Sequence, residues 1–311
     1  MITVFKDVSK FYGTDLALDH INFEIEKGEI IGLLGPNGAG KTTAIKALVG
    51  LVPIDSGEII LFNENFKKNE NSIKRRIGIV PQEIVIFDDL TARENLIFFG
   101  QLYGIKGKEL NTNVDKVLDL IGLKNYEKKL PKKFSGGMKR RLNIGCALVH
   151  KPELLIMDEP TVGIDPQSRN HILESVKELE KKGTTIIYTT HYMDEVQNIC
   201  SRVLIMDTGS IIANGSVSDL INKLDFEQKT YMEVRNPNQE LIEELSNTNG
   251  IRNVSLAGSK LTLLYEKGDN ILGEIIKIAS SFGIESIQNE APTLEDVFLK
   301  LTGKNLRDGG K

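Results

Sequence analysis

Cysteine is scarce in this 311-residue sequence, and this scarcity bears on the redox environment. The two cysteines, Cys146 and Cys200, lie far apart and in no spacing typical of a metal or redox site. Structural disulfides belong to oxidising compartments. A reducing cytosol is therefore the simplest expectation for the location of the chain.

Long apolar runs are also missing. No uninterrupted apolar segment approaches the ~18 residues that a membrane-spanning helix needs. The first residues, Met-Ile-Thr-Val-Phe-Lys-Asp, lack the apolar core of a signal peptide. We therefore expect a cytoplasmic chain that reaches a membrane only through a partner, at its inner face.

The sequence also has no excess of positive charge. The net charge of −4 and the pI of about 5.8 argue against a basic nucleic-acid-binding protein. With 40% hydrophobic and 26% charged residues, the composition is typical of a soluble globular protein. The length suits one large domain and a smaller one.

Residues 35–43 fit the phosphate-binding pattern G-x-x-x-x-G-K-[ST]. An apolar run of strand length precedes them at 29–34, and a helical pattern follows at 43–50. Glycines let successive backbone N–H groups point at one anion, and the helix N-terminus adds partial positive charge. We expect Lys41 to reach the outer phosphates and Thr42 to bind Mg²⁺. A chance Gly-rich turn is the alternative, and the motifs that follow in order argue against it.

A pair of acids lies near the end of the apolar strand predicted at 153–160. Asp158 and Glu159 would lie at the carboxyl end of this strand, where open α/β sheets bind ligands. Asp158 is the candidate Mg²⁺ ligand, and Glu159 could orient or deprotonate an attacking water. Adjacent buried carboxylates cost desolvation and have little structural use.

Three further positions are ambiguous when each is taken alone. Gln82 ends the strand predicted at 77–82 and could hold Mg²⁺ or a water, although such a glutamine is usually just solvated. Ser135, Gly136 and Gly137 open a helical run and offer a second anion site, or merely a capped helix. Tyr12 could stack on a purine ring or simply lie at the sheet surface.

Two later positions complete the candidates. Asp165 follows a turn and could reach across an interface between subunits. His191 ends the strand predicted at 184–191 and could hydrogen-bond a terminal phosphate.

The pattern of elements predicts two domains. Period-two alternation at 2–8 and 21–25, joined by 58–62, indicates an antiparallel β subdomain, and helical periodicity over 91–122 indicates a helical subdomain at about 84–150. Composition changes after Ser216. Residues 230–288 then follow the β-α-β-β-α-β order of a ferredoxin-like unit, with a last helix at 294–301. The fold class is thus α/β, a P-loop NTPase core over 1–222 with a small α+β domain at 223–311, for which we expect a regulatory or interaction role.

Taken together, the motifs resemble the ATP-binding cassette family over about residues 1–222. The resemblance implies ATP and Mg²⁺ as ligands, a permease partner, and a head-to-tail homodimer or heterodimer that closes over two ATP molecules. It makes Tyr12 the adenine-stacking residue, Ser135–Gly137 the signature, Glu159 the catalytic base and His191 the phosphate switch. Thr42 and Asp158 would bind Mg²⁺, and Gln82 would couple the nucleotide to the partner. The remaining implied nucleotide contacts are Gly35, Pro36, Asn37, Gly38, Ala39, Gly40, Lys41, Thr43 and Asp165.

Two departures from the family pattern stand out. The usual Leu-Ser-Gly-Gly-Gln is Phe-Ser-Gly-Gly-Met here, which removes the amide at Met138, and the usual Ser-Gly-Leu-Asp is Val-Gly-Ile-Asp at 162–165. The tail at 292–298, Pro-Thr-Leu-Glu-Asp-Val-Phe, is similar to the ending of cassette subunits in the drug- and lipid-exporting branch, which pair with a separate permease.

Two other function classes compete with a transporter ATPase. A soluble cassette ATPase acting on nucleic acid or ribosomes usually has two cassettes per chain or a long coiled-coil insertion, whereas only about fifty residues separate Gln82 from Ser135 here. A P-loop kinase or GTPase leaves the Ser-Gly-Gly motif and His191 unexplained.

Overall fold

The computed structural model describes residues 1–223, 228–266, 270–290 and 292–303. They form two compact units, Met1–Val217 with the residues after Lys300, and Ser218–Lys300. In this described part of the chain, no helix is long and apolar enough to cross a membrane.

A six-stranded sheet forms the centre of the first unit, with the strand order β10-β9-β3-β8-β7-β6. Neighbouring strands run parallel from β9 to β6, and β10 is an antiparallel edge. The strand bounds are Ile30–Leu34 for β3, Ile77–Val80 for β6, Leu154–Asp158 for β7, Thr185–Thr189 for β8, Arg202–Asp207 for β9 and Ser210–Gly215 for β10.

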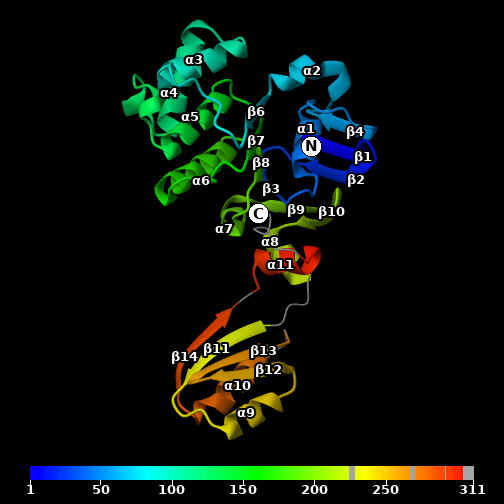
Figure 1. Ribbon diagram of the computed structural model, residues 1–311, viewed down its shortest axis with the longest axis vertical. Helices are drawn as coiled ribbons and strands as arrows, with labels where there is room; N and C mark the ends of the chain where they lie inside the picture. Colours follow the sequence, from blue (N-terminus) through cyan, green and yellow to red (C-terminus); the bar gives the residue numbers. More distant parts are fainter. Residues whose placement is uncertain (224–227, 267–269, 291, 304–311) are drawn as a thin grey trace. The chain divides into compact units, whose positions relative to one another are not determined.

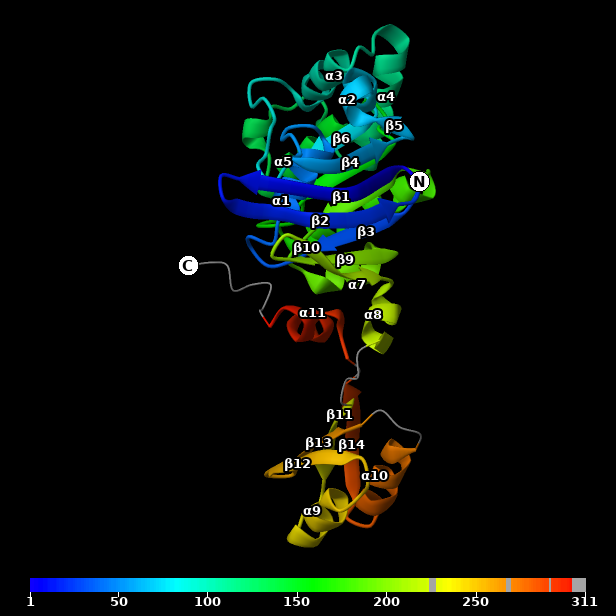
Figure 2. The ribbon, with the colours of Figure 1, turned by 90° about the vertical axis from the view of Figure 1, so that its right-hand side faces the viewer.

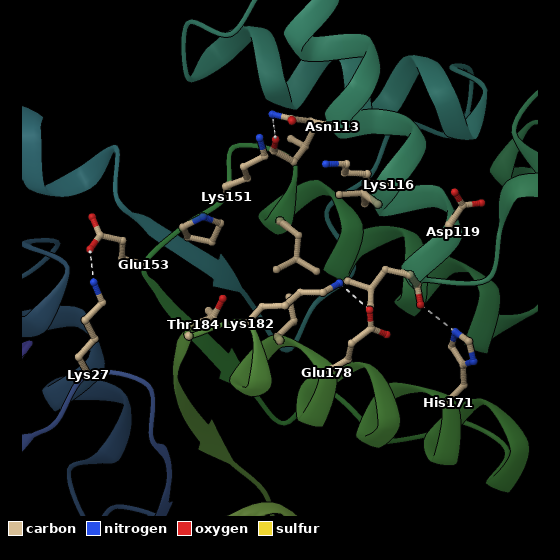
Figure 3. Close-up of a pocket in the computed structure, with 17 residues that line it drawn as sticks. Lys27, Asn113, Lys116, Asp119, Lys151, Glu153, His171, Glu178, Lys182 and Thr184 are labelled. Carbon is tan, nitrogen blue, oxygen red and sulfur yellow. Dashed lines mark hydrogen bonds and ion pairs between the residues drawn. The ribbon is translucent and has the colours of Figure 1, made fainter.

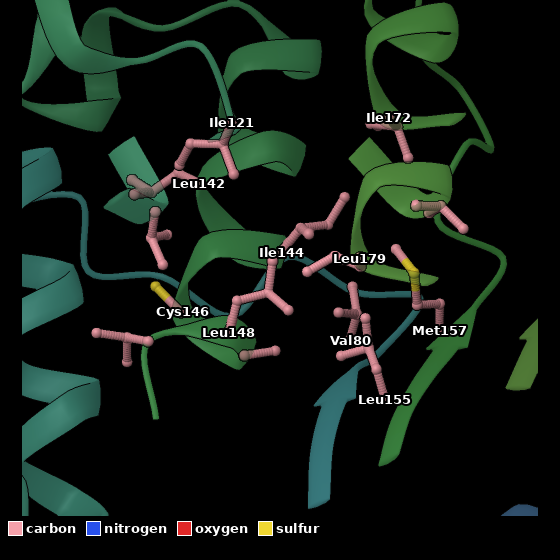
Figure 4. Close-up of a cluster of buried hydrophobic side chains, with 14 of the residues drawn as sticks. Val80, Ile121, Leu142, Ile144, Cys146, Leu148, Leu155, Met157, Ile172 and Leu179 are labelled. Carbon is pink, nitrogen blue, oxygen red and sulfur yellow. The ribbon is translucent and has the colours of Figure 1, made fainter. Parts of the chain in front are cut away.

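Both faces of this sheet are buried. On β7, Leu155 and Met157 join a cluster with the helices, whereas Leu154 and Ile156 join a second cluster on the other face. Because side chains alternate along a strand, a continuous apolar run is what such a sheet requires. Figure 4 shows how the first cluster links strands β6 and β7 to helices α5 (Gly136–Leu148) and α6 (Pro166–Lys181).

An antiparallel sheet and helix α1 (Lys41–Leu48) cover the second face (Figures 1 and 2). The strand order of this antiparallel sheet is β2-β1-β4-β5, with β1 Thr3–Tyr12, β2 Asp15–Ile25, β4 Ser56–Leu61 and β5 Glu64–Asn65. Helix α2 (Phe66–Lys74) follows β5 in the chain. Strands β1 and β2 are longer than the alternation predicts. Tyr12 is therefore the last residue of β1, not part of a loop between strands.

The helical subdomain occupies the opposite face of the sheet (Figure 1). Helices α3 (Ala92–Leu102), α4 (Gly107–Leu120) and α5 surround a buried core, with short 3₁₀ turns at Lys124–Tyr126 and Pro131–Lys133. Thr91 and Glu94 form a capping box that begins α3. Within α3, Leu96 is buried in this core, whereas Leu102 at the end of the helix is 66% exposed.

The second unit has the β-α-β-β-α-β order expected from its sequence. Its antiparallel sheet has the order β12-β13-β11-β14, and α9 and α10 pack on a core that includes Met232, Leu241 and Ile275. The bounds are β11 Gln228–Val234, α9 Gln239–Ser246, β12 Ile251–Ala257, β13 Lys260–Tyr265, α10 Ile271–Ser280 and β14 Ile284–Glu290, with α8 Val217–Lys223 before them and α11 Leu294–Thr302 after them.

Candidate functional site

Close packing shapes the predicted phosphate loop, which joins β3 to α1. A Cβ on Gly35 would lie 2.5 Å from the Met206 carbonyl oxygen of β9. One on Gly40, whose φ is 99°, would lie 2.6 Å from the Ala17 carbonyl oxygen of β2. Side chains do not fit at such distances, and this φ favours glycine. Both glycines are therefore required by the neighbouring strands.

Helix α1 begins at Lys41, two residues before the start expected from the sequence. Lys41, Thr42 and Thr43 therefore form its first turn, where backbone N–H groups have no acceptor within the helix. Together with the loop residues Asn37, Gly38 and Gly40, this turn can direct several N–H groups toward one anion. Pro36 has no N–H, and its carbonyl oxygen accepts from Ala39 N–H at 3.1 Å.

The Lys41 ammonium folds back over the phosphate loop. Its Nζ donates to the carbonyl oxygens of Gly35 at 2.6 Å and Pro36 at 3.1 Å. Burial lowers the pKa of Lys41, and the carboxylates of Glu159 and Asp158 act in the opposite direction. Both acids thus lie close enough to the ammonium to stabilise its charge.

Asp158 and Glu159 occupy the carboxyl end of β7, as predicted. Glu159 has φ of 47°, in the left-handed region that residues other than glycine rarely adopt. Its N–H donates to Thr189 O at 3.1 Å and Thr189 Oγ1 at 3.0 Å. The same hydroxyl donates to Asp158 Oδ1 at 2.6 Å. Thr189, which the sequence interpretation missed, therefore holds both acids in place.

Two side chains share the Glu159 carboxylate. Gln82 Nε2 donates to Oε2 at 2.9 Å, and His191 Nε2 pairs with Oε1. The bond from His191 lowers the pKa of Glu159, with burial opposing it. Gln82, Glu159 and His191, predicted from separate motifs, are thus in direct contact. Gln82 lies beyond β6, which ends at Val80.

The signature residues form a second group at the start of α5. Ser135 Oγ accepts from Met138 N–H at 3.2 Å, and a Cβ on Gly136 would meet open space. A Cβ on Gly137 would instead lie 2.1 Å from Ser168 Oγ and 2.9 Å from Asp165 Oδ2. Asp165 begins α6 by accepting from Ser168 N–H at 2.9 Å. The helix start at Ser135 is therefore exposed, while Gly137 packs tightly against α6.

Tyr12 is exposed at the end of β1. The residue is 49% exposed, and the Lys10 ammonium lies over its ring, 5.6 Å from the centroid. Exposure of this kind is what stacking on a base would need. The substituted residue Met138 packs against the helical core, so its side chain has a structural place.

A large groove lies away from these groups (Figure 3). It has a volume of about 1030 Å³, and Lys27, Glu153 and Thr184, which precede β3, β7 and β8, line its wall. These strands are parallel, so the groove lies at their amino ends and the phosphate loop at their carboxyl ends. It is not part of the candidate site.

Comparisons with known proteins agree on one family. Residues 18–162 match the family described as ABC transporter. Linearmycin resistance ATP-binding protein LnrL of Bacillus subtilis is 44% identical over 97% of this chain and 99% of its own length. Nod factor export ATP-binding protein I of Sinorhizobium fredii is 36% identical over 97% of this chain and 86% of its own.

Solved structures give the same result for the first unit. The structure titled as the ATP-binding subunit of an ABC transporter superposes with a TM-score of 0.66 at 30% identity, covering 72% of this chain and 93% of the other. A dimeric post-hydrolysis state of the cassette MJ0796 with ADP and phosphate gives 0.61 at 25% identity, covering 69% and 98%.

The chain belongs to the ABC transporter family. It is an ATP-binding, ATP-hydrolysing cassette subunit with Mg²⁺ as the usual partner ion, and such subunits work with membrane permeases. The predicted P-loop α/β fold and the family resemblance are confirmed. Nothing in these comparisons favours the nucleic-acid alternative.

The donor atoms of the cassette suit Mg²⁺ bound together with phosphate. Across the described ranges, no group of three or more His, Cys, Asp or Glu side chains could hold a metal ion. Mg²⁺ commonly takes one or two carboxylates, waters and substrate phosphates. The Asp158 carboxylate and the Thr42 hydroxyl are oxygen donors of this type.

A buried carboxylate behind the site was not foreseen. Glu195, on α7 (Met193–Ile199), is fully buried, and its Oε2 accepts from the hydroxyls of Thr161, Tyr188 and Thr190 at 3.0, 2.8 and 2.8 Å. Its Oε1 accepts from Arg169 Nε on α6 at 2.6 Å. Thr161 follows Glu159 by two residues, and Thr190 precedes His191. Glu195 thus ties together the segments that carry these two residues. The one sequence signal for Glu195 was its position as an acid on the apolar face of the short helix at 193–199.

The change Glu195→Gln should destabilise the cassette strongly, because it removes the buried counter-charge of Arg169. We expect the free energy of unfolding to fall by about 3 kcal/mol, the usual effect of breaking a buried pair. The matched control is Asp194→Asn, which removes the 72% exposed partner of the same guanidinium and should cost under about 1 kcal/mol. Urea unfolding followed by circular dichroism measures both. Equal losses would show that the burial of Glu195 carries no special weight.

Proposed function

We propose that this cassette powers export through a separate permease. The observation that carries the proposal is the grouping of Lys41, Gln82, Asp158, Glu159 and His191 at the carboxyl edge of one parallel sheet. The names of two relatives, for linearmycin resistance and Nod factor export, support the direction of transport. The tail at 292–298, similar to that of the drug- and lipid-exporting branch, is consistent with it.

The residues of the group take distinct roles in this proposal. The phosphate-loop N–H groups and Lys41 bind the phosphates of ATP, while Thr42, Asp158 and Gln82 hold Mg²⁺. Glu159 acts as the base for the attacking water, and His191 bonds the terminal phosphate. In the structure both oxygens of Glu159 are bonded, by Gln82 and by His191. In this proposal Glu159 becomes available as a base when Gln82 turns to Mg²⁺ and His191 turns to the terminal phosphate.

The change Glu159→Gln should abolish turnover while keeping ATP binding. The amide retains the shape of the side chain but cannot take a proton, so hydrolysis should fall roughly 10²-fold or more. ATP should then accumulate in a closed dimer. Hydrolysis by the purified variant and its ATP affinity by calorimetry check this. Near-normal hydrolysis would remove Glu159 from the role.

The signature supports a proposal about assembly. Ser135 and Gly136 expose a helix start suited to an anion, yet the phosphate loop already offers one in the same chain. A second anion site becomes useful when two subunits meet head to tail, because it then adds donors at the terminal phosphate. A related cassette is dimeric with ADP and phosphate bound, which is consistent with this arrangement.

Mixing two inactive variants tests for shared sites. Lys41→Ala disables the phosphate loop, and Ser135→Arg blocks the signature with a bulky side chain. Each homodimer then has two damaged sites. A mixed dimer places both lesions in one site and leaves the other intact, so mixing should restore part of the hydrolysis.

Two measurements keep the result of this mixing test clear. Native mass spectrometry verifies that mixed dimers form, and ATP occlusion detects an intact site even if hydrolysis requires two working sites. Mixed dimers that neither hydrolyse nor occlude ATP would show that the signature does not act on the partner's nucleotide.

The permease is proposed to dock on apolar side chains that follow Gln82. These side chains are each 37–66% exposed, and they are Ile84, Val85, Phe87, Phe98 and Leu102. The rings of Phe87 and Phe98 lie 4.8 Å apart. Such apolar exposure is typical of interaction surfaces. Docking here would place the cassette at the cytoplasmic face of the membrane, next to a residue that bonds Glu159.

The second unit is proposed to modulate the cassette without binding nucleotide. The motifs for phosphate and metal all fall in the first unit. The relatives in sequence match 97% of the chain, so they extend over the second unit, whereas the solved cassettes match about 70%.

Co-purification from membranes checks both of these proposals. The full chain should bring down an integral-membrane permease. Val85→Glu should weaken this association because it buries a charge at the interface, while Ile212→Glu, at an exposed site on β10, should not. A chain ending at Lys223 should still bind ATP with similar affinity. Equal retention by Val85→Glu and Ile212→Glu would move the docking surface elsewhere. Loss of ATP binding by a folded shortened chain would contradict the two-domain proposal.

A further inference from the structure

The segment that carries Gln82 is bonded to the helical subdomain by buried side chains. Between β6 and α3, residues 81–90 form no helix or strand, so their backbone groups need other partners. Three side chains of α3 and α5 supply them, and they are Asn95, Arg140 and Asn143. All three are at most 4% exposed.

Arg140 makes the contacts nearest to Gln82. Its Nη1 donates to Pro81 O at 2.9 Å, and its Nη2 donates to Gln82 O at 2.5 Å. Its Nε is buried with no hydrogen-bond partner. Within the described ranges, no carboxylate forms an ion pair with this guanidinium. A buried charge without a counter-charge is costly. Arg140 is kept buried by its two bonds to backbone carbonyl oxygens, and these bonds fix Pro81 and Gln82 to helix α5.

The two asparagines extend the attachment along the segment. Asn143, one turn after Arg140 on α5, accepts from Val85 N–H at 3.0 Å. Asn95 on α3 accepts from Phe87 N–H at 2.8 Å, and it donates to Phe87 O at 2.9 Å. The backbone from Pro81 to Phe87 is thus held by α5 and α3.

These contacts form a continuous path between the two groups of site residues. The Gln82 side chain donates a hydrogen bond to Glu159, which follows β7 of the six-stranded sheet. The Gln82 carbonyl oxygen accepts one from Arg140. Arg140 lies on α5, the helix that Ser135 begins. A displacement of Gln82 at the nucleotide therefore acts directly on the signature helix.

We propose that Arg140 is a positioning residue that couples Gln82 to the signature, so that nucleotide sensed in one subunit sets the placement of its Ser135. This inference goes beyond the proposed function but rests on the roles proposed there for Gln82 and the signature. Arg140 itself touches neither nucleotide nor reacting atoms.

A double-mutant cycle in the full chain tests this coupling. Arg140→Met, similar in length but without donors, should lower kcat roughly tenfold, since misplacing a catalytic part by about 1 Å can cost up to 10². The ATP affinity should stay within about twofold. In a Gln82→Ala background the same change should cost less than about twofold, because the path is already broken. Arg140→Lys, which keeps a donor, should recover part of the rate.

The control for this cycle is Lys139→Met, the neighbouring residue on α5. Lys139 also contacts residues 81–90, through an ion pair with Asp88 at 2.9 Å that is open to solvent. Exposed pairs contribute little, so kcat should stay within about twofold of the original. Equal losses in the presence and absence of Gln82, or an equal loss in the control, would overturn the coupling.

Amide hydrogen exchange gives a readout that does not depend on turnover. In the unmodified chain, MgATP should change exchange at the phosphate loop, at 82–87 and at 136–141. In Arg140→Met or Asn143→Ala, the change at the phosphate loop should persist while that at 136–141 is lost. A persisting change at 136–141 would contradict the proposal. If Gln82→Ala itself alters neither hydrolysis nor exchange, the proposed role of Gln82 fails instead.

Discussion

Burial of the six-stranded sheet on both faces is the constraint on which the first unit depends. The central strands are therefore mostly apolar, and the polar side chains of the site follow at their carboxyl ends. In a parallel array these ends meet along one edge. Lys41 after β3, Gln82 after β6, Asp158 and Glu159 at the end of β7, and His191 after β8 are brought together for this reason.

Hydrogen bonds offset the desolvation of the charged side chains at that edge. The Glu159 carboxylate is bonded by Gln82 and His191, and Asp158 by the Thr189 hydroxyl. Behind them the buried carboxylate of Glu195 accepts four hydrogen bonds. A buried charge is tolerated only with such saturation, which in turn restricts the segments that supply the donors. The loops that carry Glu159 and His191 are therefore held in place by polar contacts as much as by apolar packing.

Arg140 differs from the other buried charges because its partners are carbonyl oxygens of an irregular segment. Regular strands and helices satisfy their own backbone groups, and residues 81–90 do not. The side chains that bond these backbone groups also determine which part of the protein the segment moves with. Here that part includes α5, the helix that Ser135 begins. Residues 81–87 thereby connect the site to the signature, a role that their sequence does not indicate.

The sequence by itself determined the family and the order of the elements, and it indicated most of the residues proposed for the site. Apolar runs and glycine patterns are local, so the apolar strands that precede Gln82 and end at Asp158, the phosphate loop and the β-α-β-β-α-β order of residues 228–290 could all be predicted. Tertiary structure decided the pairing of His191 and Gln82 with Glu159, the exposure of Leu102 and the extension of β1 to Tyr12. It also decided the parts played by Thr189, Glu195 and Arg140. At their greatest reach these residues act through partners that lie 34 positions away along the chain for Glu195, 31 for Thr189 and 59 for Arg140. Such contacts leave no periodic signal, because they arise only when separate segments are packed against one another.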